Sequence, residues 1–225
     1  MSAEFVVQGS VASAEGAPVE RSPGLGTQRL ADLFMAVLAV VALAPLMLTL
    51  ALLIWVSDGG PALYGHTRVG RMGQLFRCWK FRSMVVDADK ILAEHLADDP
   101  EARAEWEANH KLRQDPRITR MGRFLRASSL DELPQLWNVW LGEMSIVGPR
   151  PIVIAEIDRY KDNFTDYCAC RPGITGLWQI SGRSDVSYDQ RVELDTRYSR
   201  SRSLLLDLKI IVSTIPAVLA QRGSY

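Results

Sequence analysis

An uncharged apolar stretch near the N-terminus limits what this chain can fold into more than any other feature. From Leu33 to Val56 the sequence contains no charged residue. A helix of about 20 such residues covers the hydrocarbon core of a bilayer, whereas a soluble helix of that length normally keeps a polar face. We therefore expect a membrane-inserted helix over residues 29–57, preceded by a tail (1–28) and followed by a cytosolic domain (58–225).

Two features bear on how this segment would sit in the membrane, and they leave two alternatives open. Pro45 lies in its middle, where a proline removes one backbone hydrogen bond and bends a helix. Because basic flanks stay in the cytoplasm, basic residues at both ends fit a re-entrant segment, which enters and leaves on one face, at least as well as a span. These flanking residues are Arg21, Arg29, Arg68, Arg71, Arg77, Lys80 and Arg82.

The overall composition excludes several classes of protein. The formal net charge is zero and the pI is about 6.8, so we expect no nucleic-acid partner. Cys78, Cys168 and Cys170 form neither a paired framework nor a zinc set, which favours a reducing compartment. Residues 1–28 are rich in Ala, Gly, Ser, Pro and Glu and lack the features of a secretory signal. We expect disorder there, with a partner-binding tail as the alternative.

A β-hairpin is expected directly after the apolar segment. Residues 63–64 and 75–82 are joined by a turn that contains glycines. The period of two along the second strand places Lys80 and Arg82 on the same face. This pair fits either a phosphate clamp or a basic rim attracted to anionic lipid.

The rest of the chain is expected to be mainly helical. Residues 85–114 are typical of solvated polar helices interrupted at Asp99-Pro100, and they leave room for a homodimer. Residues 117–126 form a basic amphipathic stretch suited to the headgroup layer, and residues 188–220 are helical again. The expected fold is thus mainly α with a small β-hairpin, in which the membrane segment and interfacial helices surround a small catalytic-sized domain.

Two adjacent carboxylates, Asp131 and Glu132, are the first candidate site. Arginines flank them in the sequence, among them Arg126, and cations around a carboxylate suit a phosphorylated anion. Ser129 and Glu132 also have the spacing of a helix-capping box. In that alternative, however, Pro134 would fall beyond the first helical turn and remove a backbone hydrogen bond.

Two later loops carry further candidates. Arg150 stands between two prolines, which fix the backbone as a preorganised guanidinium would require. The second loop combines glycines for close backbone approach with Arg171, Gln179 and Arg183. It matches no Walker or dinucleotide fingerprint. It suits either a nucleotide diphosphate or an ordinary turn-rich connection.

Four stretches, taken in order, resemble motifs of the bacterial sugar transferase family, the monotopic polyprenyl-phosphate phosphoglycosyl transferases. The resemblance covers residues 29–225. Within the family, the short length and the closing Arg222-Gly223-Ser224-Tyr225 resemble enzymes that begin exopolysaccharide synthesis by moving galactose 1-phosphate from UDP-galactose to undecaprenyl phosphate. The four stretches are residues 79–84 (WKFRSM), 129–136 (SLDELPQL), 144–151 (MSIVGPRP) and 171–183 (RPGITGLWQISGR).

The resemblance implies roles for individual residues. Asp131 would attack the β-phosphorus of a UDP-sugar, forming a phosphosugar–enzyme intermediate and releasing UMP, with Glu132 as its partner. Magnesium is the implied cofactor, held at these two carboxylates. The other matching positions are basic site residues (Lys80 and Arg126), a residue of the substrate loop (Arg150) and a further acidic position (Asp195).

The resemblance also implies the membrane topology and location. The family's membrane segment is a re-entrant helix broken at a proline that often follows a serine. Here Ala44 precedes Pro45, and the proline alone supplies the bend. The implied location is the cytoplasmic face of the bacterial inner membrane, in contact with membrane lipid.

The proposed chemistry agrees with the residues, but alternatives remain. A carboxylate attacks an anionic diphosphate only if cations neutralise its oxygens, and magnesium prefers one or two carboxylates together with phosphate oxygens. The sequence does not distinguish UDP-galactose from UDP-glucose as the donor. A non-catalytic membrane-surface scaffold for polysaccharide assembly and a single-step ternary transfer are the competing hypotheses.

Overall fold

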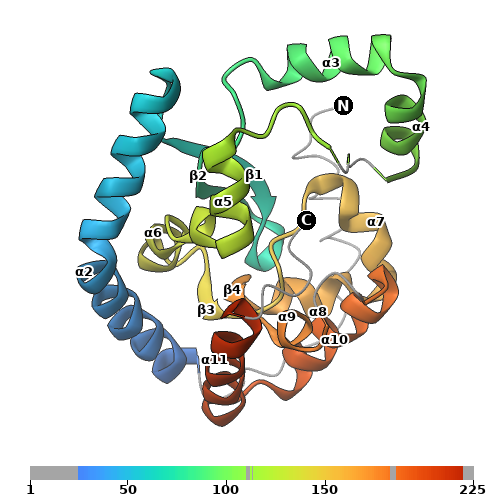
Figure 1. Cartoon of the computed structure of the whole chain (residues 1–225). Coiled ribbons are helices and arrows are strands. Elements are labelled where there is room, and N and C mark those ends of the chain that lie inside the picture. The colour runs from blue at the N-terminus through green and yellow to red at the C-terminus, as the bar shows by residue number, and fades with distance from the viewer. Residues whose placement is uncertain (1–24, 110–111, 113, 183–185, 220–225) are drawn as a thin grey trace.

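The computed structural model describes residues 25–109, 112, 114–182 and 186–219. These residues are mainly helical, as expected, and their strands form two small two-stranded sheets (Figure 1). The elements in chain order are α2 (Leu25–Asp58), β1 (Leu63–Val69), η1 (Arg71–Gly73), β2 (Leu75–Phe81), α3 (Ala88–Asp98), α4 (Pro100–Asn109), α5 (Arg120–Ser128), η2 (Leu130–Glu132), α6 (Gln135–Leu141), β3 (Ser145–Val147), η3 (Ile154–Glu156), α7 (Ile157–Tyr160), η4 (Lys161–Asn163), α8 (Phe164–Ala169), β4 (Gly173–Thr175), α9 (Leu177–Ile180), α10 (Tyr188–Ser201) and α11 (Leu204–Leu219).

Helix α2 contains the apolar stretch and begins earlier than expected. It starts at Leu25 rather than at residue 29, so the end of the expected tail is helical; residues 1–24 of that tail lie outside the described residues. The helix is assigned continuously through Pro45, and Figure 1 shows that it is bent near its middle. The expected break is therefore a bend, where the hydroxyl of Thr49 donates to the Pro45 carbonyl. Residues 26–58 are long and apolar enough to cross a membrane.

Both halves of α2 pack against the same body. Ala36 in the first half lies in a buried cluster with Leu136 and Met144, and in the second half Leu50 and Ile54 pack with buried apolar residues of β2 and α5. The opposite face of α2 is apolar, and the rest of the described chain leaves it exposed. The exposed side chains are Leu30, Phe34, Val37, Leu38, Val40, Val41, Leu46, Leu48, Leu52, Leu53, Trp55 and Val56.

The predicted hairpin is confirmed, and it supports the centre of the body. Strands β1 and β2 pair antiparallel, with Leu63 opposite Phe81 and Val69 opposite Leu75. Asn138, buried on α6, accepts from the backbone N–H of Trp79 and donates to a backbone carbonyl of β2. This amide therefore fixes α6 against β2.

A second, parallel pair of strands was not expected from the sequence. Ser145 pairs with Gly173, and Val147 pairs with Thr175. A side chain at Gly148 or Gly173 would collide with the backbone of the other segment. Glycine is therefore required where these two stretches cross.

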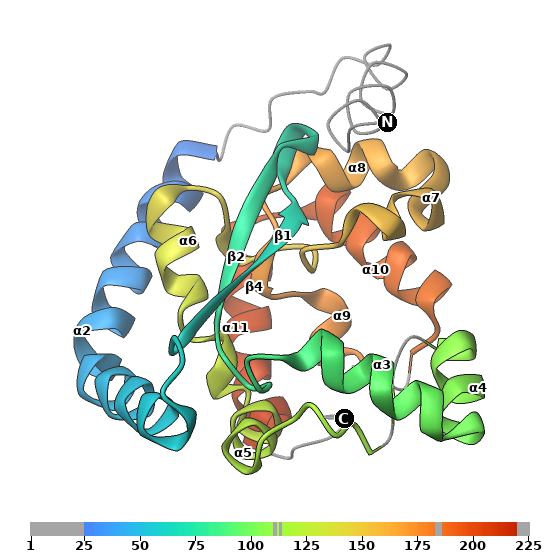
Figure 2. The same cartoon turned by 90° about the horizontal axis from the view of Figure 1, so that it is seen from above.

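The polar helices lie away from α2, whereas the last helices complete the core. Figures 1 and 2 place α4 and α2 at opposite sides of the molecule. The prediction of polar helices interrupted at Asp99-Pro100 is confirmed by α3 and α4. Helices α7, α8 and α10 enclose a core that contains Tyr160, Tyr167 and Val192.

Candidate active site

Asp131 and Glu132 lie on a short 3-10 turn between two helices. Helix α5 ends at Ser128, and Ser129 then adopts left-handed backbone geometry (φ 57°). Helix α6 begins only after Pro134, at Gln135. The capping-box interpretation is wrong, because Ser129 makes no side-chain cap. The proline moves the helix start past the carboxylates and leaves them on η2, as the sequence suggested.

Lys80 of β2 lies between the two carboxylates. Its Nζ is 2.6 Å from Oε1 of Glu132 and 3.8 Å from Oδ2 of Asp131. All three side chains are between one-tenth and one-quarter exposed. The hairpin and η2 thus bring together residues that are far apart in the sequence.

The surrounding charges act differently on the two carboxylates. Burial raises the pKa of Asp131 and neighbouring Glu132 adds to this, while Lys80 and Arg126 partly oppose the rise. Burial would also raise the pKa of Glu132, but the charges of Lys80 and Arg150 lower it below its ordinary value. Glu132 is therefore the firmly ionised member of the pair.

Arg126 approaches the pair from α5. Its Nε donates to the hydroxyl of Ser83 over 2.9 Å, which fixes the guanidinium near Asp131. Arg82, which the strand pattern placed on the same face as Lys80 for a phosphate clamp or a basic rim, is paired with Asp58 at the end of α2. Both roles of the Lys80–Arg82 pair stay predictions.

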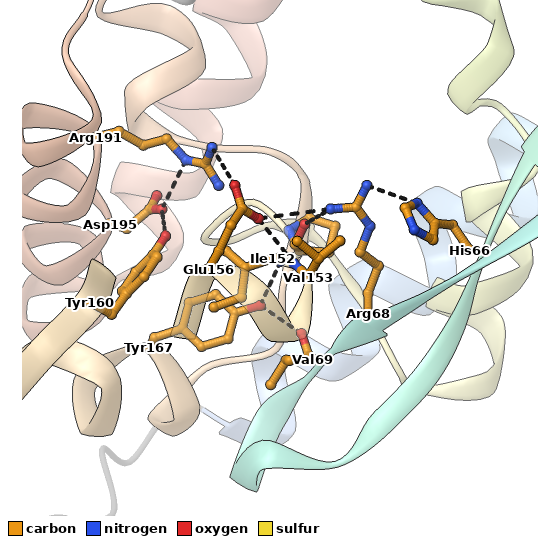
Figure 3. Close-up of polar contacts among 11 residues, drawn as sticks. His66, Arg68, Val69, Ile152, Val153, Glu156, Tyr160, Tyr167, Arg191 and Asp195 are labelled. Atoms are coloured by element: carbon orange, nitrogen blue, oxygen red, sulfur yellow. Dashed lines mark hydrogen bonds and ion pairs between the residues drawn. The ribbon is translucent and has the colours of Figure 1, made fainter. Parts of the chain in front are cut away.

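Two further arginines lie on the side of Glu132. Arg150 and Arg68 both lower the pKa of this carboxylate, and the Arg150 guanidinium lies 5.6 Å from the ring centre of Trp178. Arg68 donates to the Pro151 carbonyl over 3.2 Å and lies 3.1 Å from Nδ1 of His66 (Figure 3). The cations therefore continue from the carboxylates toward Trp178.

Asp195 belongs to a buried network next to these arginines. Tyr160 donates to Asp195 over 2.7 Å, and Nε of Arg191 lies 4.0 Å from the same carboxylate (Figure 3). Arg191 also lies 3.9 Å from Glu156 and 5.1 Å from the ring centre of Trp178. Burial raises the pKa of Asp195 to about 7, against the lowering effects of Tyr160, Arg191 and Arg150.

Three charged residues of this region were not predicted as site residues: Arg68, Glu156 and Arg191. Arg191 precedes Asp195 by four residues, the spacing at which helix side chains meet, and this signal could have identified it. Arg68 and Glu156 come from β1 and η3 and meet through the fold, at 4.0 Å. Their sequence positions contain no comparable signal.

Two of the three remaining predicted binding residues, Arg171 and Gln179, donate hydrogen bonds to backbone carbonyls. Arg171 donates to the Gly142 carbonyl over 2.8 Å and lines a small cavity beside α2 with Gln28 and Asp32. Gln179 donates to the Ile174 carbonyl over 2.9 Å. Arg183 lies outside the described residues. Substrate binding by these three residues stays a prediction.

The donor set fits magnesium only together with a phosphorylated ligand. Among the described residues, no group of three or more His, Cys, Asp or Glu could hold a metal ion. Asp131 and Glu132 supply two carboxylates, one of which already contacts Lys80. Magnesium commonly takes one or two carboxylates and completes its octahedron with water and phosphate oxygens.

Comparison with known proteins finds related sugar transferases. A family model described as bacterial sugar transferase matches residues 25–221. The undecaprenyl-phosphate galactose phosphotransferase of Salmonella typhimurium is 52% identical over 198 residues, which are 88% of this chain and 41% of that protein. The exopolysaccharide production protein ExoY of Sinorhizobium fredii is 52% identical over 199 residues, 88% of each chain.

A less similar relative is named for a different sugar, glucose. The UDP-glucose:undecaprenyl-phosphate glucose-1-phosphate transferase of Escherichia coli is 35% identical over 221 residues, 92% of this chain and 44% of that protein. The chain thus spans less than half the length of the Salmonella and Escherichia relatives and most of the length of the Sinorhizobium protein.

Proposed function

This chain belongs to the bacterial sugar transferase family, and from that premise we propose that it transfers a hexose 1-phosphate from a UDP-sugar to undecaprenyl phosphate. The observation that carries the proposal is the contact of Lys80 with Glu132 beside a second, partly exposed carboxylate, Asp131. Relatives named for galactose or galactose phosphate transfer are 52% and 51% identical, against 35% for one named for glucose. Galactose 1-phosphate is therefore the proposed group, and exopolysaccharide synthesis the proposed pathway.

Asp131 is the proposed nucleophile. A carboxylate oxygen bonds to the β-phosphorus, and the bond from that phosphorus to the bridging oxygen breaks, so UMP leaves. The charges of Lys80 and Arg126 near Asp131 and of Arg150 near Glu132 would offset the repulsion between the carboxylate and the diphosphate. Glu132, held by Lys80, keeps this cation in place.

The second half-reaction regenerates Asp131. A phosphate oxygen of the lipid attacks the phosphorus of the adduct, and the carboxylate leaves. The donor and the lipid then need not occupy the site together, because each reacts in turn. Magnesium at Asp131 and Glu132 would neutralise phosphate oxygens, since two carboxylates and a bound diphosphate form a suitable set of oxygen ligands.

The shape of α2 supports a site at the cytoplasmic surface of the inner membrane. Its two halves pack on the same body, so both of its ends belong on one side of a bilayer. A straight helix over Leu25–Asp58 would measure roughly 50 Å, whereas the hydrocarbon core is roughly 30 Å thick. We propose a re-entrant helix that bends at Pro45 within the membrane.

The exposed apolar side chains next to the carboxylates support the same orientation. Phe124 of α5 and Trp137 and Trp140 of α6 are at least half exposed. Aromatic residues favour the headgroup layer, and the carboxylates lie on the turn between these two helices. A lipid phosphate could then reach Asp131 without leaving the interface.

The decisive experiment measures UMP release from a panel of UDP-hexoses by the full chain in lipid nanodiscs. With magnesium and undecaprenyl phosphate, we expect release from UDP-galactose and none from the Asp131→Asn variant, which should remain in the membrane fraction. Without the lipid, wild-type protein should yield a phosphosugar adduct on Asp131. Undiminished release by Asp131→Asn would refute the mechanism, and failure to trap an adduct would favour a single ternary step. An inert wild-type protein would favour a scaffold.

A further inference from the structure

Asp32 is a buried carboxylate on the face of α2 that packs against the body. It is 3% exposed, and a buried carboxylate is costly unless it is hydrogen-bonded. The hydroxyl of Ser145 lies 2.9 and 2.8 Å from its two oxygens, and the backbone N–H of Ile146 donates to it over 3.0 Å. All these bonds lead to β3, more than a hundred residues later in the sequence.

Strand β3 connects this clamp with the candidate active site. The residues that follow it are Gly148, Pro149 and Arg150, and the charge of Arg150 lowers the pKa of Glu132. Gly148 N–H donates to Thr175 over 2.9 Å, and Gly173 N–H donates to Pro149 over 2.8 Å. The second strand, β4, leads in turn to Trp178.

The two strands thus position the two residues of one cation–π contact. Arg150 follows β3, and Trp178, over whose ring its guanidinium lies, follows β4. A shift of β3 along β4 would displace Arg150 from both Trp178 and Glu132. Asp32 opposes such a shift, because its carboxylate holds β3 at its first two residues.

We propose that Asp32 is a positioning residue for the sugar-phosphate transfer. Its hydrogen bonds to Ser145 and Ile146 fix the position of Arg150, so the active site is competent only when α2 is correctly packed against the body. The inference rests on the proposed function, because the activity of that reaction is the quantity measured. It means that Asp32 of α2 helps to position an active-site residue in addition to holding the helix to the body.

An anchor that only holds α2 to the body is the competing explanation, and the helix provides a matched control. Gln28 lies four residues before Asp32, on the same face, and its Nε2 donates to Asp207 over 2.9 Å and to Tyr198 over 3.2 Å. These partners belong to α10 and α11. Tyr198 donates in turn to the Val147 carbonyl of β3 over 3.1 Å, but that bond does not involve Gln28. Loss of Gln28 therefore loosens α2 without releasing the clamp.

The test compares Asp32→Leu, Ser145→Ala and Gln28→Ala in nanodiscs. Leucine suits an apolar helix and accepts no hydrogen bond, but it is larger than aspartate, so Ser145→Ala provides a second variant without added bulk. We expect both clamp variants to lower kcat/KM for UDP-galactose about ten- to a hundredfold, because small displacements of positioning groups have effects of that size. Gln28→Ala should stay within about twofold. Retention of all three variants in the membrane fraction shows that α2 is still inserted.

A double-mutant cycle with Arg150→Ala decides whether the clamp acts through Arg150. If it does, Ser145→Ala should add nothing to the loss caused by Arg150→Ala, because residues that act through one another are not additive. Additive losses would overturn the inference, as would an equal loss in Gln28→Ala. If Asp32→Leu fails to insert, the Ser145 cycle alone carries the decision. Activity in Asp131→Asn, measured in the same series, would instead refute the proposed function.

Discussion

Lys80 donates to Glu132 over 2.6 Å, whereas the nearest oxygen of Asp131 is 3.8 Å from the same ammonium group. One cation thus forms a direct hydrogen bond with one carboxylate and acts on the other only through its charge. An oxygen of Asp131 is left without this hydrogen bond, as a nucleophile requires. The asymmetry between two adjacent residues supports their division into nucleophile and partner.

Removal of the ammonium group should therefore disable the site. We predict that Lys80→Met lowers kcat for UMP release at least about a hundredfold, the usual cost of losing one charge-stabilising donor. Lys80→Arg should retain part of the activity, because a guanidinium preserves the charge but not its position. Steady-state UMP release in nanodiscs measures both effects. The control is Lys90→Met, since Lys90 is exposed on α3 and pairs with Glu94 on the same helix. A Lys80→Met enzyme with near-normal turnover would contradict the assignment.

The pH dependence should report the ionisation of Asp131. Burial raises the pKa of this carboxyl, and the charges of Lys80 and Arg126 partly offset that rise. Because the ionised form attacks, kcat/KM should fall as the pH drops through this pKa. Arg126→Gln removes one lowering charge, so we predict that the acid limb moves to higher pH and that the variant loses more activity at pH 6 than at pH 8.

Two controls separate the charge of Arg126 from its contacts. Ser83→Ala removes the hydrogen-bond partner of Arg126 and leaves its charge, so the acid limb should move less than in Arg126→Gln. Arg123→Gln changes an exposed arginine of the same helix whose side chain donates to the Ile118 carbonyl. An equal shift of the acid limb in all three variants would argue against a specific effect on Asp131.

Local patterns in the sequence predicted those parts of the fold that local interactions determine. Alternation around Lys80 predicted the hairpin, and Asp99-Pro100 marked the boundary between α3 and α4. Pro134 likewise indicated that α6 starts late. In each case a residue's own backbone restriction, or the period of its neighbours, sets the outcome.

Long-range pairings could not be predicted in the same way. The β3–β4 pair joins two three-residue strands that are too short for a periodic signal. The salt bridge between Arg82 and Asp58 depends on where α2 ends on the body. Ser129 satisfied the capping pattern, but the proline that follows determined the local structure. Sequence motifs identified Asp131, Glu132 and Lys80, whereas the fold brings Arg68 and Arg191 to Glu156 and places the charge of Arg68 near Glu132.

The buried network around Asp195 should make stability depend on pH. Burial raises the pKa of Asp195 to about 7, well above its ordinary value. The folded state therefore binds more protons than the unfolded chain between about pH 4 and pH 7, and its stability falls as the pH rises through this window. We predict that Asp195→Asn flattens the fall in melting temperature from pH 5 to pH 8.

A second variant checks the direction of this effect. Tyr160 donates to Asp195, and this bond lowers the pKa of the carboxyl. Tyr160→Phe should raise that pKa further and shift the loss of stability to higher pH. Melting curves recorded in one detergent across the pH series measure both variants. An unchanged slope in Asp195→Asn would assign the pH dependence to other groups.

The two ends of α2 should be accessible from the same side of the membrane. Asp32 binds β3 near one end, and Asp58 pairs with Arg82 at the other. We predict that a membrane-impermeant maleimide labels Gly26→Cys and Ser57→Cys only from the cytoplasmic side, in a chain whose three native cysteines are replaced by alanine. A side chain at position 26 would point into open space, and Ser57 is exposed. Inverted and right-side-out vesicles distinguish the two faces.

A third position tests whether the bend lies within lipid. Val41 is exposed on the apolar face of α2, before Pro45. A re-entrant helix buries this position in the hydrocarbon layer, so Val41→Cys should resist the reagent on both sides until detergent is added. Labelling of positions 26 and 57 from opposite sides would show that α2 spans the bilayer. That result would contradict the re-entrant arrangement, in which both ends of the helix pack on one body. Labelling at position 41 without detergent would instead show that α2 lies on the surface.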